Sequence, residues 1–154
     1  MQEEKRLAKS ETKAEPNLVD ALFQLSFMLQ GRLARIAAGH ELSLIQVRLL
    51  GILRDREPTM LDLAAYLELE KSSLSGLVDR AEARGLVERV PSRDDRRATT
   101  VRMTTLGHQL SRVVAETIGP DVESLLAVLP EKDRARLGAL VARVVTQPGV
   151  TLED

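Results

Sequence analysis

Residues 59–85 read TMLDLAAYLELEKSSLSGLVDRAEARG and contain two predicted helices joined by a very short turn. Thr59 and Asp62 form the pattern of a capping box, which predicts the start of the first helix. Only residues 68–70 separate this helix from a second one over residues 71–84, and the glycine that follows suits a Schellman stop. Two helices joined so tightly indicate a helix-turn-helix, with the second helix in the recognition position.

The second helix carries small hydroxyl and basic side chains on the side opposite its apolar residues. These polar residues are Lys71, Ser72, Ser73, Ser75 and Arg80. Serine hydroxyls and a helix N-terminus donate hydrogen bonds to phosphates, and hydroxyls also reach base edges. The alternative is an ordinary solvated helix surface, but the neighbouring helix-turn-helix pattern favours contact with DNA.

Two runs suited to β-strands follow, residues 86–90 and 99–103, and predict a hairpin. The charged residues of its tip are Arg93, Asp94, Asp95, Arg96 and Arg97. Arginines at such a tip insert into a narrow minor groove or follow it, where the potential is most negative. The alternative is a charged hairpin whose aspartates neutralise its arginines.

Further helices are predicted on both sides of this module. One runs from Asn17 to about Ala38, and a second starts at the N-cap residue Ser43 and runs to about residue 54. After the hairpin, Thr104 caps a long helical pattern that reaches Leu129.

Proline breaks are expected in the second half of the chain. Gly119 and Pro120 should kink or interrupt the long helix. Leu129 and Pro130 open a last helix with an apolar stripe. That stripe consists of Leu137, Leu140, Val141, Val144 and Val145, before Pro148 and Gly149 end the helix.

Composition favours a mainly helical protein, and the two β-suited runs add a small hairpin. The chain's 154 residues are 44% apolar, which is enough for a core, and the sequence has no cysteine for disulfides, thiolate metal sites or thiol redox sensing.

The net charge is −1, yet residues 71–102 hold eight basic and five acidic residues. Positive charge concentrated in one region is typical of a phosphate-facing surface.

These patterns predict one main domain. Residues 1–16 read as a frayed or disordered arm without a signal peptide or membrane span, so a cytoplasmic location is expected. Residues 17–147 form the domain and residues 148–154 a tail. Within the domain, residues 17–42 and 104–147 are predicted dimerisation helices, and residues 43–103 the winged helix-turn-helix, with the helix-turn-helix at 59–84 and the wing at 86–103.

The stretch from Thr59 to Gly107 resembles the MarR (multiple antibiotic resistance regulator) family of winged-helix transcription factors. The residues that carry the resemblance are Leu63, Ala64, Leu67, Lys71, Ser72, Ser73, Leu74, Ser75, Leu77, Val78, Asp79, Arg80, Gly85, Leu86, Val87, Glu88, Arg89, Asp95, Arg96, Arg97, Met103, Thr104 and Gly107. With one long helix before them and two after, they cover nearly the whole chain.

The resemblance implies a homodimer that places two winged modules in successive major grooves of a palindromic operator, typically as a repressor, and often a pocket for a small-molecule effector. It also implies that Asp79 supports the wing by pairing with Arg97. One departure is Gly76, where many relatives carry an arginine. This glycine removes one expected DNA contact and weakens the helix locally.

Other classes of function are less well supported by the sequence. Asp94 and Asp95 lack the burial that would separate their pKa values as acid and base, and no nucleotide loop or nucleophile elbow is present, so no enzyme is expected. His40 and His108 have no further ligand at metal-binding spacing, so no metal or other cofactor is expected.

Two alternatives concern the apolar faces. Phe23, Phe27 and Met28 are candidates for lining an effector pocket, although residues at this spacing more often belong to a core or a dimer interface. A helical dimeric protein-interaction module without DNA binding would explain the apolar stripes, but would leave the basic hairpin without a purpose.

Overall fold

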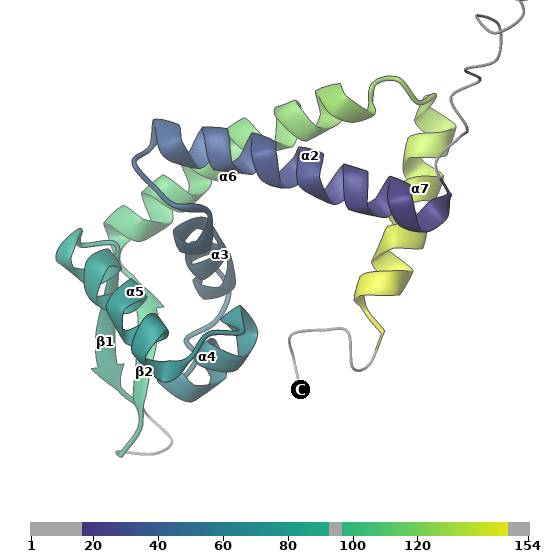
Figure 1. Cartoon of the computed structure of the whole chain (residues 1–154). Coiled ribbons are helices and arrows are strands. Elements are labelled where there is room, and N and C mark those ends of the chain that lie inside the picture. The colour runs from purple at the N-terminus through teal and green to yellow at the C-terminus, as the bar shows by residue number, and fades with distance from the viewer. Residues whose placement is uncertain (1–16, 93–96, 148–154) are drawn as a thin grey trace, which may run out of the picture. The chain divides into compact units, whose positions relative to one another are not determined.

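The computed structural model describes residues 17–92 and 97–147. The elements follow in the order α2 (Leu18–Gly39), α3 (Leu44–Leu53), α4 (Met60–Leu67), α5 (Lys71–Ala83), β1 (Val87–Pro91), β2 (Thr99–Met103), α6 (Thr105–Leu126) and α7 (Glu131–Val145) (Figure 1). This confirms the predicted mainly helical fold with a small hairpin. The chain divides into two compact units after Gly31, so the first part of α2 belongs to one unit and all later elements to the other.

Side-chain caps fix the starts of three helices in the second unit. Ser43 accepts a hydrogen bond from the backbone N–H of Gln46 (3.3 Å), whose side chain accepts one from the Ser43 N–H (2.9 Å). Thr59 and Asp62 make the same reciprocal pair at 3.2 Å, and Thr104 caps α6. The helix starts predicted at these positions are therefore confirmed, because each cap satisfies N–H groups that the helix itself leaves unpaired.

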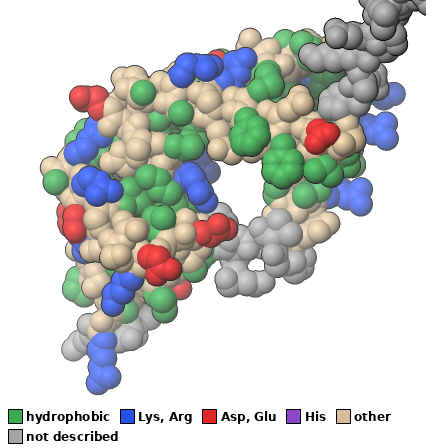
Figure 2. Space-filling model, viewed as in Figure 1, with side chains coloured by type: hydrophobic (Ala, Val, Ile, Leu, Met, Phe, Trp, Pro, Cys, Tyr) green, Lys and Arg blue, Asp and Glu red, His purple; other side chains and the backbone are tan. Residues whose placement is uncertain are grey.

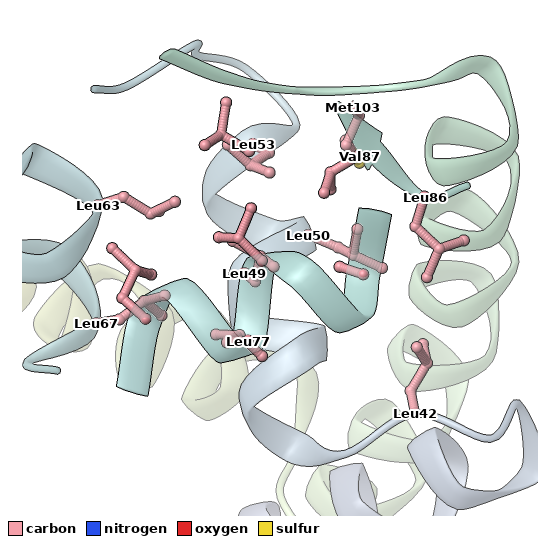
Figure 3. Packing of buried hydrophobic residues seen from close by; sticks show 14 of the residues in the cluster. Leu42, Leu49, Leu50, Leu53, Leu63, Leu67, Leu77, Leu86, Val87 and Met103 are labelled. Atoms are coloured by element: carbon pink, nitrogen blue, oxygen red, sulfur yellow. The ribbon is translucent and has the colours of Figure 1, made fainter. Parts of the chain in front are cut away.

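The core lies between α3, α4, α5 and the hairpin. Leu49, Leu63 and Leu77 are fully buried, and Val87 and Val101 cover them from the two strands. Figure 3 shows Leu49, Leu63, Leu77 and Val87 converging from different elements on one cluster. Burial of each such side chain contributes roughly 1.5–3 kcal/mol, so this core holds α5 and the hairpin together.

The hairpin begins one residue later than the sequence predicts. The strands pair in antiparallel register from Val87 with Met103 to Pro91 with Thr99. Leu86 is not in the strand because its backbone N–H donates to the Ala81 carbonyl (3.0 Å) and helps to close α5. This Schellman closure explains the shift.

Gly85 makes that closure possible. Its φ is +69°, in the left-handed region that glycine adopts without a Cβ clash, and its N–H donates to the Glu82 carbonyl (2.8 Å). The predicted Schellman stop is confirmed.

Residues 58–59 add a short third segment beside the hairpin. Thr59 forms a bridge with Thr100, and the N–H of Val101 donates to the Pro58 carbonyl (3.0 Å). The sequence pattern had predicted Thr59 only as a helix cap. The pairing ties the start of α4 to β2.

Of the two effects predicted for Gly119 and Pro120, interruption of the long helix is wrong, whereas a kink stays a prediction. Pro120 lies inside α6, which continues from Thr105 to Leu126. A proline lacks one N–H donor, but this single lost hydrogen bond does not end the helix here. The helix ends at Leu126 and not near Leu129, which lies in the turn before α7 and donates its N–H to the Leu126 carbonyl (3.0 Å).

Two helices expose much of their apolar surface. In α2, Leu18, Leu22 and Phe23 are exposed, and Figure 2 shows hydrophobic side chains on the surface of this helix. In α7, none of the residues is buried, and four members of its predicted stripe are exposed: Leu140, Val141, Val144 and Val145. The predicted end of α7 at residues 148–149 lies outside the described residues.

Among the described residues, no single helix is both long and apolar enough to cross a membrane. The helices Leu18–Gly39 and Leu44–Leu53 pass such a test only when they are taken together.

Candidate DNA interface

The outer face of α5 carries the hydroxyl and basic residues predicted for DNA contact. Lys71, Ser72 and Ser73 are exposed at the start of the helix, and Ser75 is partly exposed. The opposite face is fixed by the core through Leu74, Leu77, Val78 and Ala81, all of which are buried. The helical period therefore leaves the serine face turned to solvent.

The N-terminus of α5 has free capacity for an anion. Glu70 occupies the N-cap position, and no side chain in the described part of the chain caps the helix. The first N–H groups of a helix have no partner within the helix, and its dipole places partial positive charge there. Lys71 adds a full positive charge at the same end. The arrangement suits a phosphate.

The tight turn before α5 depends on a left-handed residue. Glu68 has φ +54°, and its N–H and that of Leu69 donate to carbonyls of the last turn of α4 (3.1 and 3.0 Å). Non-glycine residues adopt this conformation at a cost of roughly 1 kcal/mol, so the surrounding contacts must hold it. The turn thereby brings α5 directly after α4, as predicted.

Gly76 lies in the middle of the outer face, beside the side chain of Arg80. A Cβ added at residue 76 would lie 3.2 Å from the Nη1 atom of Arg80, so the guanidinium lies next to this glycine. Arg80 itself is exposed. This face lacks an arginine at position 76, but the guanidinium of Arg80, one turn later, lies close to that position.

Arg89 joins the wing to the recognition helix. From strand β1, its guanidinium binds the carboxylates of Asp79 (2.7 Å) and Glu82 (2.5 Å) on α5. Its backbone N–H also donates to Glu82 (3.0 Å), and Nη2 lies 3.4 Å from the Ser75 carbonyl. Because two anchors on adjacent turns of α5 hold one strand residue, the start of the wing has a defined position on the helix.

Asp79 therefore pairs with Arg89 in the structure. The pair with Arg97 that the family resemblance implies stays a prediction. Arg97 is exposed just before β2 and has an interaction partner of its own. Arg93 and Arg96 lie outside the described residues.

A second ion pair stiffens the hairpin. Glu88 and Arg102 face each other directly in the strand register, and the Arg102 Nε donates to Glu88 at 2.8 Å. Figure 2 shows Lys and Arg side chains over this module and at the outer end of the hairpin. The wing therefore carries positive charge on a supported strand pair.

Phe23, Phe27 and Met28 lie exposed on α2, where the two phenyl rings stack with centroids 6.4 Å apart. A cavity of about 140 Å³ lies elsewhere, between α3 and α6. Its lining is mostly apolar, with Arg54 as the one charged residue: Leu42, Val47, Leu50, Gly51, Arg54, Ser111, Val114, Ala115 and Ile118. The three predicted pocket residues are not among those that line this cavity.

In the described part of the chain, no group of three or more His, Asp or Glu residues could hold a metal ion.

Sequence reasoning gave no structural role to two arginines that bridge elements. Arg89 and Arg84 each bind groups on another element. Two signals pointed to Arg89: its place near the middle of a predicted strand, and its presence among the residues that carry the family resemblance. Pairing partners across elements depend on the strand register, which the sequence does not give.

Comparisons with known proteins agree with this geometry. A model of the MarR family matches residues 40–98. The HTH-type transcriptional regulator PecS of Dickeya dadantii is 28% identical over 137 residues, which cover 84% of this chain and 81% of PecS. Wild-type MarR from E. coli, in its apo form, superposes with a TM-score of 0.75 at 22% identity, over 85% of this chain and 98% of MarR. A MepR–DNA complex from S. aureus gives a TM-score of 0.68 at 18% identity, over 86% and 98% of the two chains.

A tight helix-turn-helix followed by an antiparallel hairpin that is anchored to its second helix defines a winged helix-turn-helix protein. The structural matches establish this fold along most of the chain. The family match over the winged module and the similarity to PecS over most of its length support a MarR-family regulator.

Proposed function

We propose that this chain is a sequence-specific transcriptional regulator that binds double-stranded DNA as a homodimer. The observation that carries the proposal is the exposed serine and lysine face at the uncapped N-terminus of α5, next to a wing fixed by Arg89. The MepR structure that shares this fold contains DNA, and PecS is named as a transcriptional regulator. A regulator of this kind acts without catalysis and works in the cytoplasm, where the DNA is.

In the proposed complex, α5 enters the major groove. Lys71, Ser72, Ser73, Ser75 and Arg80 contact phosphates and base edges, and phosphate contacts supply most of the affinity. Arg93, Arg96 and Arg97 place the wing over the flanking minor groove, with Asp79 as its support on α5. The two half-sites of a palindromic operator lie about 34 Å apart, one turn of DNA.

The homodimer is proposed from the open apolar faces of α2 and α7. A helix that exposes its apolar stripe within one chain is stabilised when another surface covers that stripe. A closed two-fold dimer covers the same stripe on both copies. Binding to a promoter as such a dimer makes repression the simplest mode of action.

The cavity between α3 and α6 is the proposed effector site, in place of the exposed phenylalanines of α2. A cavity near 150 Å³ accommodates a benzene-sized ring, and Arg54 provides one cation at this lining. The proposed effector is therefore a small, mainly apolar acid. Benzoate should raise the melting temperature more than benzyl alcohol does, and Arg54→Met should remove the difference. Equal shifts with both probes would contradict the assignment.

The test of DNA binding is a titration of the purified protein against the duplex upstream of its own gene, followed by fluorescence anisotropy at several salt concentrations. The proposal requires binding that survives a random-sequence competitor and weakens steeply with salt, with a slope of about −0.9 per phosphate contact. No binding at low salt would leave the helical protein-interaction module as the better reading.

Variants then locate the surface. Ser73→Ala and Arg96→Ala should each weaken binding to the duplex, whereas Arg112→Ala, in an exposed position of α6, should not. Ser73→Ala removes a hydroxyl from the start of α5, and Arg96→Ala removes a charge from the wing. Unchanged binding in both would place the DNA surface elsewhere.

A further inference from the structure

The end of α2 forms a corner that a residue other than glycine holds in the left-handed region. Glu41 has φ +55°, its N–H donates to the Ala38 carbonyl (3.0 Å), and the N–H of Leu42 donates to the Ala37 carbonyl (2.9 Å). This is a Schellman closure with glutamate where glycine is usual, and the backbone conformation costs roughly 1 kcal/mol. Such a corner persists only where other contacts hold it.

Arg84 supplies such a contact from the end of the recognition helix. It directly follows the last residue of α5, and its Nη1 donates to the Glu41 carbonyl at 2.5 Å. Its Nη2 donates to the His40 carbonyl at 3.3 Å. One planar guanidinium thus reaches two adjacent carbonyls at the C-terminal end of α2, where positive charge is also favoured by the helix dipole.

These hydrogen bonds join two elements with different proposed tasks. The helix α2 carries an open apolar face, and α5 carries the DNA face. Arg84 is exposed, so the bonds add little to the stability of the fold as a whole. Their main effect is on geometry, since they fix the last turn of α5 against the last turn of α2.

We infer that Arg84 is a positioning residue that sets the separation of the two recognition helices in the dimer. The inference rests on the proposed function. If α2 belongs to the dimer interface, each recognition helix is tied to that interface through the corner at residues 40–42. Loss of Arg84 then lets each winged module turn about the corner, and the protein loses part of its preference for one half-site spacing.

The test compares Arg84→Met with the wild type on operators whose half-sites are moved apart or together by one or two base pairs. The ratio of affinities between the natural and the altered spacing should fall by roughly fivefold or more in the variant. Affinity for random duplex and the slope of affinity with salt should stay the same. Arg112→Met, which removes the same charge from α6, should keep the wild-type ratio, and Arg84→Lys should restore only part of it because lysine has no planar fork.

A second measurement needs no DNA. Since the sequence has no cysteine, Ser72→Cys provides one spin-label site on α5 in each copy, and pulsed electron paramagnetic resonance gives the distribution of distances between the two labels. We expect a narrow distribution that broadens in the Arg84→Met background while the melting temperature changes little.

Three results would overturn the inference. The first is an equal loss of affinity at every spacing with a shallower salt slope, because this would make Arg84 a phosphate contact. The second is an unchanged spacing ratio together with an unchanged distance distribution. The third is a wild-type protein in which no distance between two labels can be measured, because its copies are not paired. A dimer that binds no duplex would instead refute the proposed function, and the distance distribution would still decide the role of Arg84.

Discussion

Arg89 binds three groups on the recognition helix from its place in β1. The side chain is largely buried, with 24% exposed, and its partners Asp79 and Glu82 are two acids on neighbouring turns of α5. Without the guanidinium these carboxylates would repel each other at close range. The arginine therefore both joins the wing to α5 and neutralises the acids that would otherwise oppose a phosphate-facing surface.

Arg89→Ala should lower the free energy of unfolding by roughly 1–3 kcal/mol, because hydrogen bonds to charged groups contribute this much when they are partly buried. Arg102→Ala is the matched control. It removes an arginine from the paired strand, but Arg102 is more exposed than Arg89 and its ion pair with Glu88 lies at the surface, so a loss of up to about 1 kcal/mol is expected. Urea unfolding measures the free energy of unfolding of both variants. Equal losses would show that the ion pairs of Arg89 with α5 contribute no more to stability than the pair of Arg102 with Glu88.

At Gly107, α6 approaches the backbone of Leu86 closely. A Cβ at this position would lie 2.0 Å from the Leu86 carbonyl oxygen, which is backbone and cannot move aside easily. The N–H of Thr104 donates to this same carbonyl (3.1 Å), so the first turn of α6 is held against the chain between α5 and β1.

Gly107→Ala should destabilise the protein by several kcal/mol or prevent folding, in line with other overpacked sites. Gly138→Ala, inside α7, is the control, because apart from its chain neighbours nothing lies within 4 Å of the added Cβ. It should stabilise the helix by about 0.5–1 kcal/mol. Thermal unfolding followed by circular dichroism tests the pair, and a similar response in both variants would contradict the close approach.

At the scale of elements, local signals predicted where helices start better than where they end. The caps at Ser43, Thr59 and Thr104 depend on residues within three positions of each other, so the sequence contains all of the information. The end of α2 follows a different rule, because Glu41 occupies the left-handed position there with support from Arg84, a residue far along the chain. The sequence showed a glycine at residue 39 and predicted the end of the helix one residue early.

The candidate site was predictable to a similar degree. The outer face of α5 followed from the helical period, since its buried partners are evenly spaced leucine, valine and alanine residues. The anchoring by Arg89 did not follow, because it depends on how the strand lies on the helix. Pro120 misled the prediction for α6, since one missing donor is weaker than the many hydrogen bonds on either side of it.

The apolar stripe of α7 gives an element-scale prediction. Val144→Asp places a charge in the middle of the stripe. If the proposed dimer covers this stripe, the variant should be monomeric in analytical ultracentrifugation, because a buried unpaired carboxylate is costly. Ala139→Asp, on the opposite face of the same helix, is the control and should leave the dimer intact. Dissociation in both variants would mean that helix stability, not the stripe, determines the association.

At the scale of the whole molecule, folding and association should be linked. If α2 and α7 are covered only in a dimer, the free energy of unfolding includes the association, and the melting temperature must rise with protein concentration. A tenfold increase in concentration is equivalent to about 1.4 kcal/mol, which corresponds to a rise of a few degrees for a chain of this size. Differential scanning calorimetry over a hundredfold range measures it. A constant melting temperature would argue for a monomer, and Val144→Asp should abolish the dependence.

The open stripe of α7 has a consequence for the lifetime of the protein in a cell. None of the residues of α7 is buried within its own chain, so a single copy presents this helix to proteases, which cleave chain segments that open easily. If the proposed dimer covers this helix, a cell that holds few copies should degrade a larger share of them, because dimers form in proportion to the square of the monomer concentration. The amount of intact regulator would then rise more steeply than its rate of synthesis. Promoters that bind it would respond to small changes in expression.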